Sequence, residues 1–235
     1  MWKLRPLMDY LRANFIKKFI PEGHLNLDES IVKYYGRHPN KQFIRGKPIL
    51  FGYKVWCLNA ELGYLVKFDF YKGKSTRGNA LYENGFGKCA APLMNMIDDF
   101  LRDVSKLPLK FYFDNLFTGF NILHYLKQRG YDGTGTIRDN RIPKSCPLPA
   151  KNTFSKSLER DDFISAIDKE DGIIVTKWLG NNVVSVASTC HGVNPTAQVK
   201  RFSQKEKRII QVLRPSVITE YNGFMGGTDL MDENI

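Results

Sequence analysis

The sequence predicts a mixed α/β fold in which a β-sheet is flanked by helices. The chain has 235 residues, of which 43% are hydrophobic and 13% aromatic, so it can bury a sizeable core. Residues 110–113, Lys-Phe-Tyr-Phe, are typical of a buried central strand because aromatic residues favour strands. Apolar residues recur at helical spacing in residues 90–104 and 120–130, which predicts a helix on each side of this strand.

The first part of the chain predicts one helix and three strands. Residues 4–20 have the apolar spacing of an amphipathic helix, and Pro-Glu-Gly at 21–23 ends it. A strand follows from residue 24 to 30 with Asp28 at its end, and residues 31–35 either prolong it or open a loop. Residues 51–58 and 63–71 predict an antiparallel hairpin because aromatic and β-branched residues dominate both.

The next part predicts the alternation of helices and strands. Residues 71–88 are rich in Gly, Lys and Asn and predict a loop, and residues 131–138 predict a fifth short strand. The resulting order is three strands, helix, strand, helix, strand, which is the arrangement of an RNase H-like core of the retroviral-integrase type. In that arrangement the first and fourth strands are neighbours, so we expect Asp28 and Asp114 to lie close together.

The remaining residues predict an inserted β-rich domain. Short strands with Asp-Gly and Gly-Asn-Asn turns, within residues 161–192, predict a small β-meander inserted into the core. The basic segment 199–214 predicts a solvated or DNA-facing surface. We therefore expect residues 1–139 to form the first part of the core, 140–220 the inserted domain, and 221–235 the return to the core.

Aspartates at three places are the candidate site residues. Asp114 ends the hydrophobic strand, but Asp followed by Asn before a helix also fits a turn residue or a helix N-cap. Asp229 and Asp232 are three residues apart, which on a helix puts both on one face, although acids at a helix start also complement the dipole. Gly226-Gly227 reads as a flexible entry and Thr228 as an N-cap. Carboxylates that the fold brings together repel one another, and a divalent cation relieves that repulsion.

Charge and cysteine usage restrict the partners. The formal net charge is +11, which favours nucleic acid over an anionic membrane. The loop 36–48 contains Arg37, Lys41, Arg45 and Lys47, which suit phosphate contacts, although a solvated basic loop has the same composition. The four cysteines are far apart and form no CxxC pair, so they predict no zinc ribbon and suit a reducing compartment. No signal peptide and no long apolar run is visible, so we expect neither secretion nor a membrane span.

Several stretches, taken together and in order, resemble the piggyBac transposase family. They are Leu27-Asp28-Glu29-Ser30, Phe113-Asp114-Asn115-Leu116-Phe117-Thr118 and Gly226-Gly227-Thr228-Asp229-Leu230-Met231-Asp232. Residues 41–48 with 51–54, and residues 130–138, are also similar to that family. The resemblance runs from residue 4 to 234, which is nearly the whole chain.

The resemblance implies a DDE/D nuclease core with Asp28, Asp114 and Asp229 as the catalytic and metal-binding residues. Asp232 matches a fourth acidic position near the site. Family members cut DNA at transposon ends, pass through a hairpin intermediate and insert at TTAA. Two Mg²⁺ or Mn²⁺ ions would serve this chemistry, with Asp28 bridging both and Asp114 and Asp229 holding one each.

The resemblance also implies the partners and the location. We expect DNA as the partner, a nuclear protein, no membrane contact, and a homodimer formed through family domains that lie outside this sequence. The expected DNA-binding residues are Arg37, Lys41, Arg45, Lys47 and Arg138.

The departures from the family leave the activity open. The family's N-terminal DNA-binding and dimerisation region, its final core helix and its C-terminal zinc domain do not appear, so we expect truncation at both ends to impair catalysis. A non-enzymatic, domesticated DNA- or chromatin-binding remnant is the alternative. A translated fragment without a selected role is a third interpretation.

Overall fold

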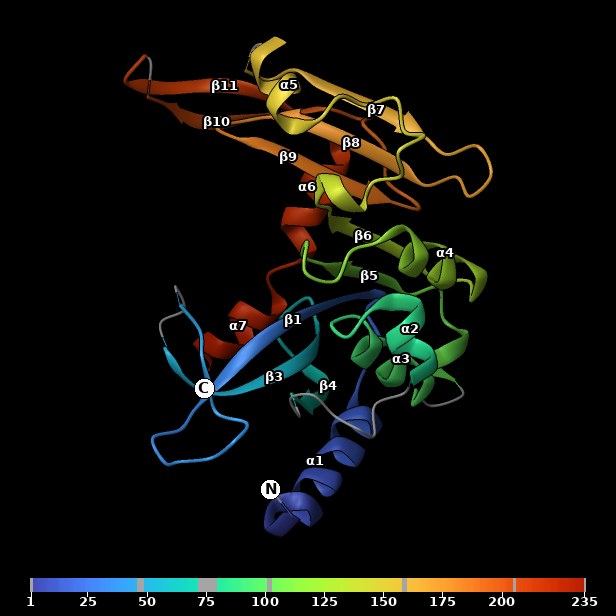
Figure 1. The fold of residues 1–235 in the computed structure, drawn as a ribbon, viewed down its shortest axis with the longest axis vertical. Helices are drawn as coiled ribbons and strands as arrows, with labels where there is room; N and C mark the ends of the chain where they lie inside the picture. Colours follow the sequence, from blue (N-terminus) through green and yellow to red (C-terminus); the bar gives the residue numbers. More distant parts are fainter. Residues whose placement is uncertain are drawn as a thin grey trace. The chain divides into compact units, whose positions relative to one another are not determined.

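The computed structural model describes residues 2–45, 49–71, 80–100, 103–157, 160–204 and 206–234. The chain divides into two compact units (Figure 1). Unit 1 comprises Met1–Leu109 and Phe224–Ile235, and unit 2 comprises Lys110–Gly223. The three-part division expected from the sequence, 1–139, 140–220 and 221–235, follows the resemblance and stays a prediction.

Unit 1 is a small antiparallel sheet with helices. Strand β3 pairs with β1, β2 and β4, always antiparallel. The elements of unit 1 are η1 (Trp2–Leu4), α1 (Arg5–Lys18), β1 (His24–Lys33), β2 (Gln42–Phe43), β3 (Phe51–Ala60), β4 (Leu65–Phe70), α2 (Ala80–Phe86), α3 (Ala91–Asp98), η2 (Val104–Lys106) and α7 (Gly227–Glu233).

Helices cover both faces of the unit 1 sheet. Met231 of α7 packs with Val55, Cys57 and Phe68, and partly buried residues of α1 (Met8, Leu11 and Phe15) pack against the same cluster. Because strand side chains alternate between faces, Lys67, which pairs with Leu58, lies on the opposite face. There its Nζ is 3.5 Å from Asp99, directly after α3. Helices α1 and α7 therefore share one face of the sheet, and the end of α3 lies over the other.

Unit 2 is a mixed sheet in the order β5-β6-β9-β8-β7. Strand β5 pairs parallel with β6, and β6–β9, β9–β8 and β8–β7 are antiparallel. A separate two-stranded sheet consists of β10 and β11. The elements are β5 (Lys110–Phe113), α4 (Phe120–Gln128), β6 (Asp132–Thr136), η3 (Asp139–Arg141), α5 (Lys151–Ser157), β7 (Phe163–Ile167), β8 (Ile174–Leu179), β9 (Val183–Ser188), β10 (Ala197–Ser203), β11 (Arg208–Arg214) and α6 (Ser216–Phe224).

An apolar cluster joins the unit 2 sheet to the β10–β11 hairpin. Trp178 and Val186 of the sheet pack with Val212 of the hairpin and with Val217 and Ile218 of α6. The indole Nε1 of Trp178 donates to the Leu213 carbonyl at 2.9 Å, so the one polar atom of the buried ring is satisfied.

The predicted elements of the core were found, with differences at their ends. The helix at 4–20, the strands at 51–58, 63–71, 110–113 and 131–138 and the helix at 120–130 are confirmed as α1, β3, β4, β5, β6 and α4. The helix predicted at 90–104 ends earlier, at Asp98. The short strands within 161–192 are confirmed as the antiparallel meander β7-β8-β9, and β9 also pairs with β6, so the meander extends the sheet of unit 2.

Three helices and one hairpin were missed. Helix α2 lies in the predicted loop 71–88 and has no buried residue among those described, so it lacks the apolar stripe that marks a helix. Helices α5 and α6 begin just after Pro149 and Pro215, where no helix was predicted. Strands β10 and β11 are mostly exposed, so their cations hide the strand pattern. Among the described residues, none of the helices is long and apolar enough to cross a membrane.

Candidate active site

Asp28 lies in the middle of β1, opposite Cys57 of β3. The prediction that Asp28 ends the strand is wrong because β1 continues to Lys33. Alternation places Asp28 on the same sheet face as Asn26 and Ser30. The side chain is half-buried, and its Oδ1 accepts the backbone N–H of Glu29 at 2.8 Å.

Helix α7 docks on this face through buried polar groups. The hydroxyl of Thr228 donates to Oδ1 of Asn59 at 3.1 Å and also lies 3.3 Å from Oδ1 of Asn26. All three residues are buried, with exposed fractions of 0 to 1%. One helical turn later, Oδ1 of Asp232 accepts the hydroxyl of Ser30 at 2.6 Å. Because Thr228 and Asp232 contact residues 26 and 30, α7 runs beside β1 with Asp28 between the two contacts (Figure 1).

Gly227 permits the close approach of α7 to the sheet. A Cβ at this position would collide with the amide of Asn26 and the carbonyl of Ala60. The interpretation of Gly226-Gly227 as a flexible entry therefore does not describe Gly227. The N-cap position is Gly226 rather than Thr228, whose hydroxyl is used in the buried dock instead.

The electrostatics of Cys57 show that two of the predicted acids gather here. Burial, the nearby Asp232 carboxylate and, to a lesser extent, Asp28 raise the pKa of the Cys57 thiol to about 12. Both carboxylates therefore act on the same buried thiol of β3, on the sheet face where α7 packs. Asp229 lies in the first turn of α7 and is exposed.

Asp114 lies in unit 2, directly after β5. Its Oδ1 accepts the backbone N–H of Leu116 at 2.7 Å, and its carbonyl accepts the N–H groups of Phe117 and Thr118. Helix α4 begins at Phe120 with Gly119 as its N-cap. Asp114 is therefore not the helix cap, but the turn alternative is confirmed, because the residue closes the turn that follows the strand.

Arg141 holds this turn and was missed from the sequence. One nitrogen of its guanidinium, Nη1, donates to the carbonyls of Asn115, Leu116 and Thr118 at 3.1, 2.9 and 2.9 Å. Nearby, Nε of Arg138 donates to Oδ1 of Asn115 at 2.8 Å. In the sequence, Arg141 is a single cation in a proline-rich stretch. No local pattern indicates that its side chain bonds to residues about 25 positions earlier.

The donor chemistry suits a divalent ion, but neither unit by itself supplies a full ligand set. Carboxylate oxygens are the donors that Mg²⁺ and Mn²⁺ prefer. In the described parts of the chain, no group of three or more His, Cys, Asp or Glu side chains is placed to hold a metal. Asp28 and Asp229 belong to unit 1 and Asp114 to unit 2.

The predicted DNA-binding cations differ in their availability. Arg37 and Arg45 are exposed. Lys41 instead ties its own loop, because its Nζ donates to the carbonyls of Tyr35 and Gly36 at 3.2 Å and lies 5.2 Å from the centre of the Phe51 ring. Lys47 lies outside the described residues, and Arg138 is exposed while bonded to Asn115.

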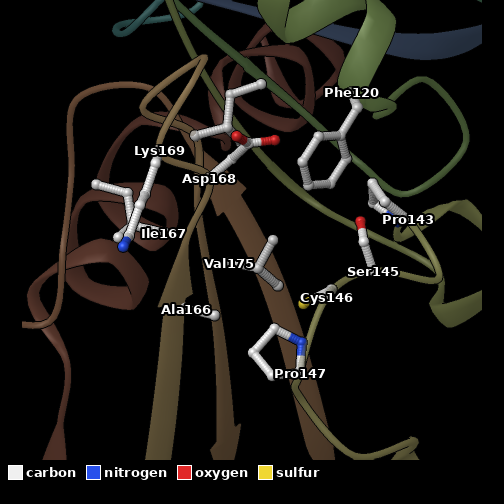
Figure 2. Close-up of a pocket in the computed structure, with 11 residues that line it drawn as sticks. Phe120, Pro143, Ser145, Cys146, Pro147, Ala166, Ile167, Asp168, Lys169 and Val175 are labelled. Carbon is white, nitrogen blue, oxygen red and sulfur yellow. The ribbon is translucent and has the colours of Figure 1, made fainter.

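Unit 2 also contains an apolar pocket of about 300 Å³. Figure 2 shows Phe120, Val175 and Cys146 around the hollow, with Pro143 and Pro147 beside them. Asp168 is the one carboxylate among its described lining residues. The described lining of this pocket therefore does not gather the candidate aspartates.

The fold matches that of a solved transposase. The structure of a piggyBac transposase synaptic complex with hairpin DNA superposes with a TM-score of 0.72 at 20% identity, covering 98% of this chain and 44% of that chain. The fold is therefore RNase H-like, as predicted, and this is the class that the structure by itself defines.

Sequence comparison identifies the family. The model of the transposase IS4 family matches residues 1–235, and the chain belongs to that family. It is 43% identical over 235 residues to human piggyBac transposable element-derived protein 3 and 32% identical over 234 residues to human piggyBac transposable element-derived protein 2. The chain spans 38% of the length of each of these relatives. The resemblance inferred from the motifs is confirmed.

Proposed function

We propose that the chain is the core of a DNA transposase that cleaves and joins DNA strands with a divalent metal ion. The observation that carries this proposal is the docking of α7, which bears Asp229 and Asp232, on the face of β1 that presents Asp28. Transposases of the DDE class use divalent metal ions in general. We assign Asp28, Asp114 and Asp229 as the ion ligands, with Asp232 as a supporting acid.

The chain's own residues would prepare this site. Thr228 and its two asparagine partners hold α7 at one position on the sheet, and Ser30 orients the Asp232 carboxylate. Arg141 holds the turn that carries Asp114. When bound, Mg²⁺ or Mn²⁺ would activate water or a 3′-hydroxyl and stabilise the leaving oxygen. Such a site requires ligands that are held rigidly, which is what these hydrogen bonds supply.

DNA is the proposed partner, with TTAA as the target and the nucleus as the location. The net charge of +11 and the exposed Arg37 and Arg45 support binding to phosphates. The matched transposase structure contains hairpin DNA. A tagged chain observed in cells would test nuclear localisation, and light scattering would test the proposed homodimer.

A cleavage assay tests the enzymatic proposal. We expect the chain to nick duplex DNA containing TTAA in Mg²⁺ or Mn²⁺, and to cut a duplex with permuted TTAA less. Asp28→Asn, Asp114→Asn and Asp229→Asn should each reduce nicking to background. Glu233→Gln is the matched control, because it removes an exposed acid from the same helix, α7.

A metal-binding measurement gives a second readout that is independent of cleavage. Free Mn²⁺, followed by electron paramagnetic resonance, should be taken up by the wild-type chain and less by the three Asp→Asn variants. Uptake and nicking that are unchanged in all three variants would exclude the assigned ligands.

The second candidate is a non-enzymatic DNA- or chromatin-binding remnant. It is favoured by the engagement of the Asp232 carboxylate with Ser30 and by a basic charge that is sufficient for binding without chemistry. It predicts that the DNA affinity falls steeply as the salt concentration rises and is unchanged in all three Asp→Asn variants. It also predicts that the chain does not nick DNA. An affinity that does not respond to salt would contradict it.

A further inference from the structure

We propose that unit 2 contains a phosphate-binding pocket between the β8–β9 turn and strand β10, with Arg160 and Arg201 as its cationic ligands. The phosphate group is that of the DNA backbone, and this part of the inference rests on the proposed function. The pocket is separate from the aspartates and from the loop 36–48.

The pocket has the size and composition of an anion site. Its volume is about 250 Å³, and its described lining contains two arginines and no carboxylate. Neutral groups complete the wall, so the local charge is positive. The lining residues are Arg160, Trp178, Gly180, Asn181, Asn182, Val184 and Arg201.

Arg160 is held in place and keeps an unused donor. One nitrogen of its guanidinium, Nη2, donates to Oδ1 of Asn181 at 2.8 Å and to the carbonyl of Phe202 at 3.3 Å. Its Nε is buried and has no hydrogen-bond partner. A buried N–H of a charged group without a partner is costly. This atom has almost no exposed surface, so an anion in the pocket would interact with the guanidinium charge rather than with this N–H.

Arg201 provides the second cation from the hairpin. It lies on β10 opposite Ile210 and is exposed. Burial and then the positive charge of Arg201 lower the pKa of Arg214, which lies on β11 opposite Ala197. Arg214 is itself occupied, because its Nε donates to the Thr219 hydroxyl at 2.9 Å. Like charges placed together destabilise one another, and a bound anion removes that repulsion.

Phosphate suits this arrangement better than a carboxylate ligand or an apolar ligand. The planar guanidinium fork matches phosphate oxygens, and two arginines can contact different oxygens of one group. Trp178 supplies a rigid wall, since its Nε1 is already bonded to Leu213. The acids nearest to the site, Asp161 and Glu206, line the adjoining hollow, where Glu206 is paired with Arg208 at 2.6 Å.

The test compares two arginines of the same hairpin. Arg201→Gln removes a proposed ligand, and Arg208→Gln removes an exposed arginine that is paired with Glu206. Both changes lower the net charge equally, and neither residue is buried, so both variants should fold. Arg160 is the other proposed ligand, and Arg160→Lys keeps its positive charge but removes the planar guanidinium group.

The first arm uses inorganic phosphate, with chloride at equal ionic strength as the reference. Phosphate should raise the unfolding temperature of the wild-type chain and of Arg208→Gln. In Arg201→Gln and Arg160→Lys the phosphate affinity should fall at least about tenfold, which corresponds to about 1.4 kcal/mol. An unchanged response to phosphate in both variants would overturn the pocket.

The second arm uses duplex DNA over a range of salt concentrations. Loss of one phosphate contact should lower the slope of log affinity against log salt by about 0.9 in Arg201→Gln and leave it unchanged in Arg208→Gln. If phosphate binding is lost but the DNA slope is not, the DNA assignment is overturned in favour of a free phosphate compound. If the wild-type chain binds phosphate but no DNA, the DNA assignment and the proposed function fail, and the pocket itself stands.

Discussion

The two units attach their last elements to their sheets with a different balance of contacts. Unit 1 docks α7 with one buried apolar residue, Met231, and with hydrogen bonds, from Thr228 to two asparagines and from Ser30 to Asp232. Unit 2 docks the β10–β11 hairpin and α6 with an apolar cluster around Trp178. Apolar packing stabilises strongly but tolerates small shifts, whereas hydrogen bonds demand fixed geometry. The unit with the hydrogen-bonded dock is the one that presents Asp28, Asp229 and Asp232.

The largest expected effect tests the apolar dock. Trp178→Ala should lower the free energy of unfolding of unit 2 by about 4 kcal/mol, because it leaves a cavity in the cluster. Hydrogen exchange should accelerate in β8–β11 while β1 and β3 remain protected. Phe202→Ala, on the same hairpin but 55% exposed, should cost under about 1 kcal/mol. Equal costs for the two variants would show that the cluster is not the dock.

The next effect comes from Lys177, a buried cation with a charged partner among the described residues of unit 2. Nζ of Lys177 lies 2.9 Å from Asp139 Oδ1 and 2.7 Å from the carbonyl of Pro149, and the lysine side chain is 2% exposed. Asp139→Asn should lower the free energy of unfolding by about 3 kcal/mol, because Lys177 loses its counter-charge. Urea unfolding measures the cost, and Asp103→Asn, at an exposed position of unit 1, is the control.

The same pair predicts a pH dependence. Burial raises the pKa of Asp139, but hydrogen bonds from the Lys151 N–H and from Lys177 outweigh it, so the pKa lies below its ordinary value. A depressed carboxyl pKa stabilises the folded state above the unfolded value, about 3.9, and this contribution is lost as the pH falls through the folded value. The difference in the free energy of unfolding between wild type and Asp139→Asn should be constant from pH 6 to 8 and shrink below about pH 4.

Breaking the hydrogen bonds that dock α7 in unit 1 should affect metal binding more than the free energy of unfolding. Thr228→Val leaves two buried asparagine oxygens without their donor, which should cost about 2 kcal/mol in urea unfolding. Thr228→Ser keeps the hydroxyl and should cost under about 1 kcal/mol. If α7 positions the acids, the valine variant should also take up less Mn²⁺. If Thr228→Val is less stable but takes up Mn²⁺ normally, the hydrogen bonds of Thr228 do not position the acids that bind the metal.

The smallest expected effect compares adjacent glycines. Gly227→Ala should cost about 1 kcal/mol because the new Cβ meets the Ala60 carbonyl, whereas a Cβ at Gly226 meets nothing within 4 Å. Gly226→Ala should therefore be neutral or slightly stabilising. Thermal unfolding of the two variants measures the difference, and equal midpoints would mean that α7 is not held closely against the sheet.

Local patterns were sufficient for most of the core but not for its polar exceptions. The aromatic run at 110–113 and the helical spacing at 120–130 correspond to β5 and α4 because both bury an apolar face. Asp28 was placed at the end of its strand because a carboxylate is costly to bury inside one, but β1 continues to Lys33. The polar side chains of Asn26 and Ser30 on the same face form hydrogen bonds with α7, about 200 residues later. The hairpin at 197–214 was hidden because most of its residues are exposed.

The sequence by itself determined the family, the candidate aspartates of the site and the basic character of the chain, because these depend on residue types and their order. The tertiary structure decided where Asp28 lies in its strand, which residues dock α7, how Arg141 supports the turn after Asp114 and that Arg160 and Arg201 share a pocket. The physical reason is that apolar burial repeats with the period of a helix or strand and is visible locally. A hydrogen bond or a shared charge between distant residues has no such period, so folding alone reveals it.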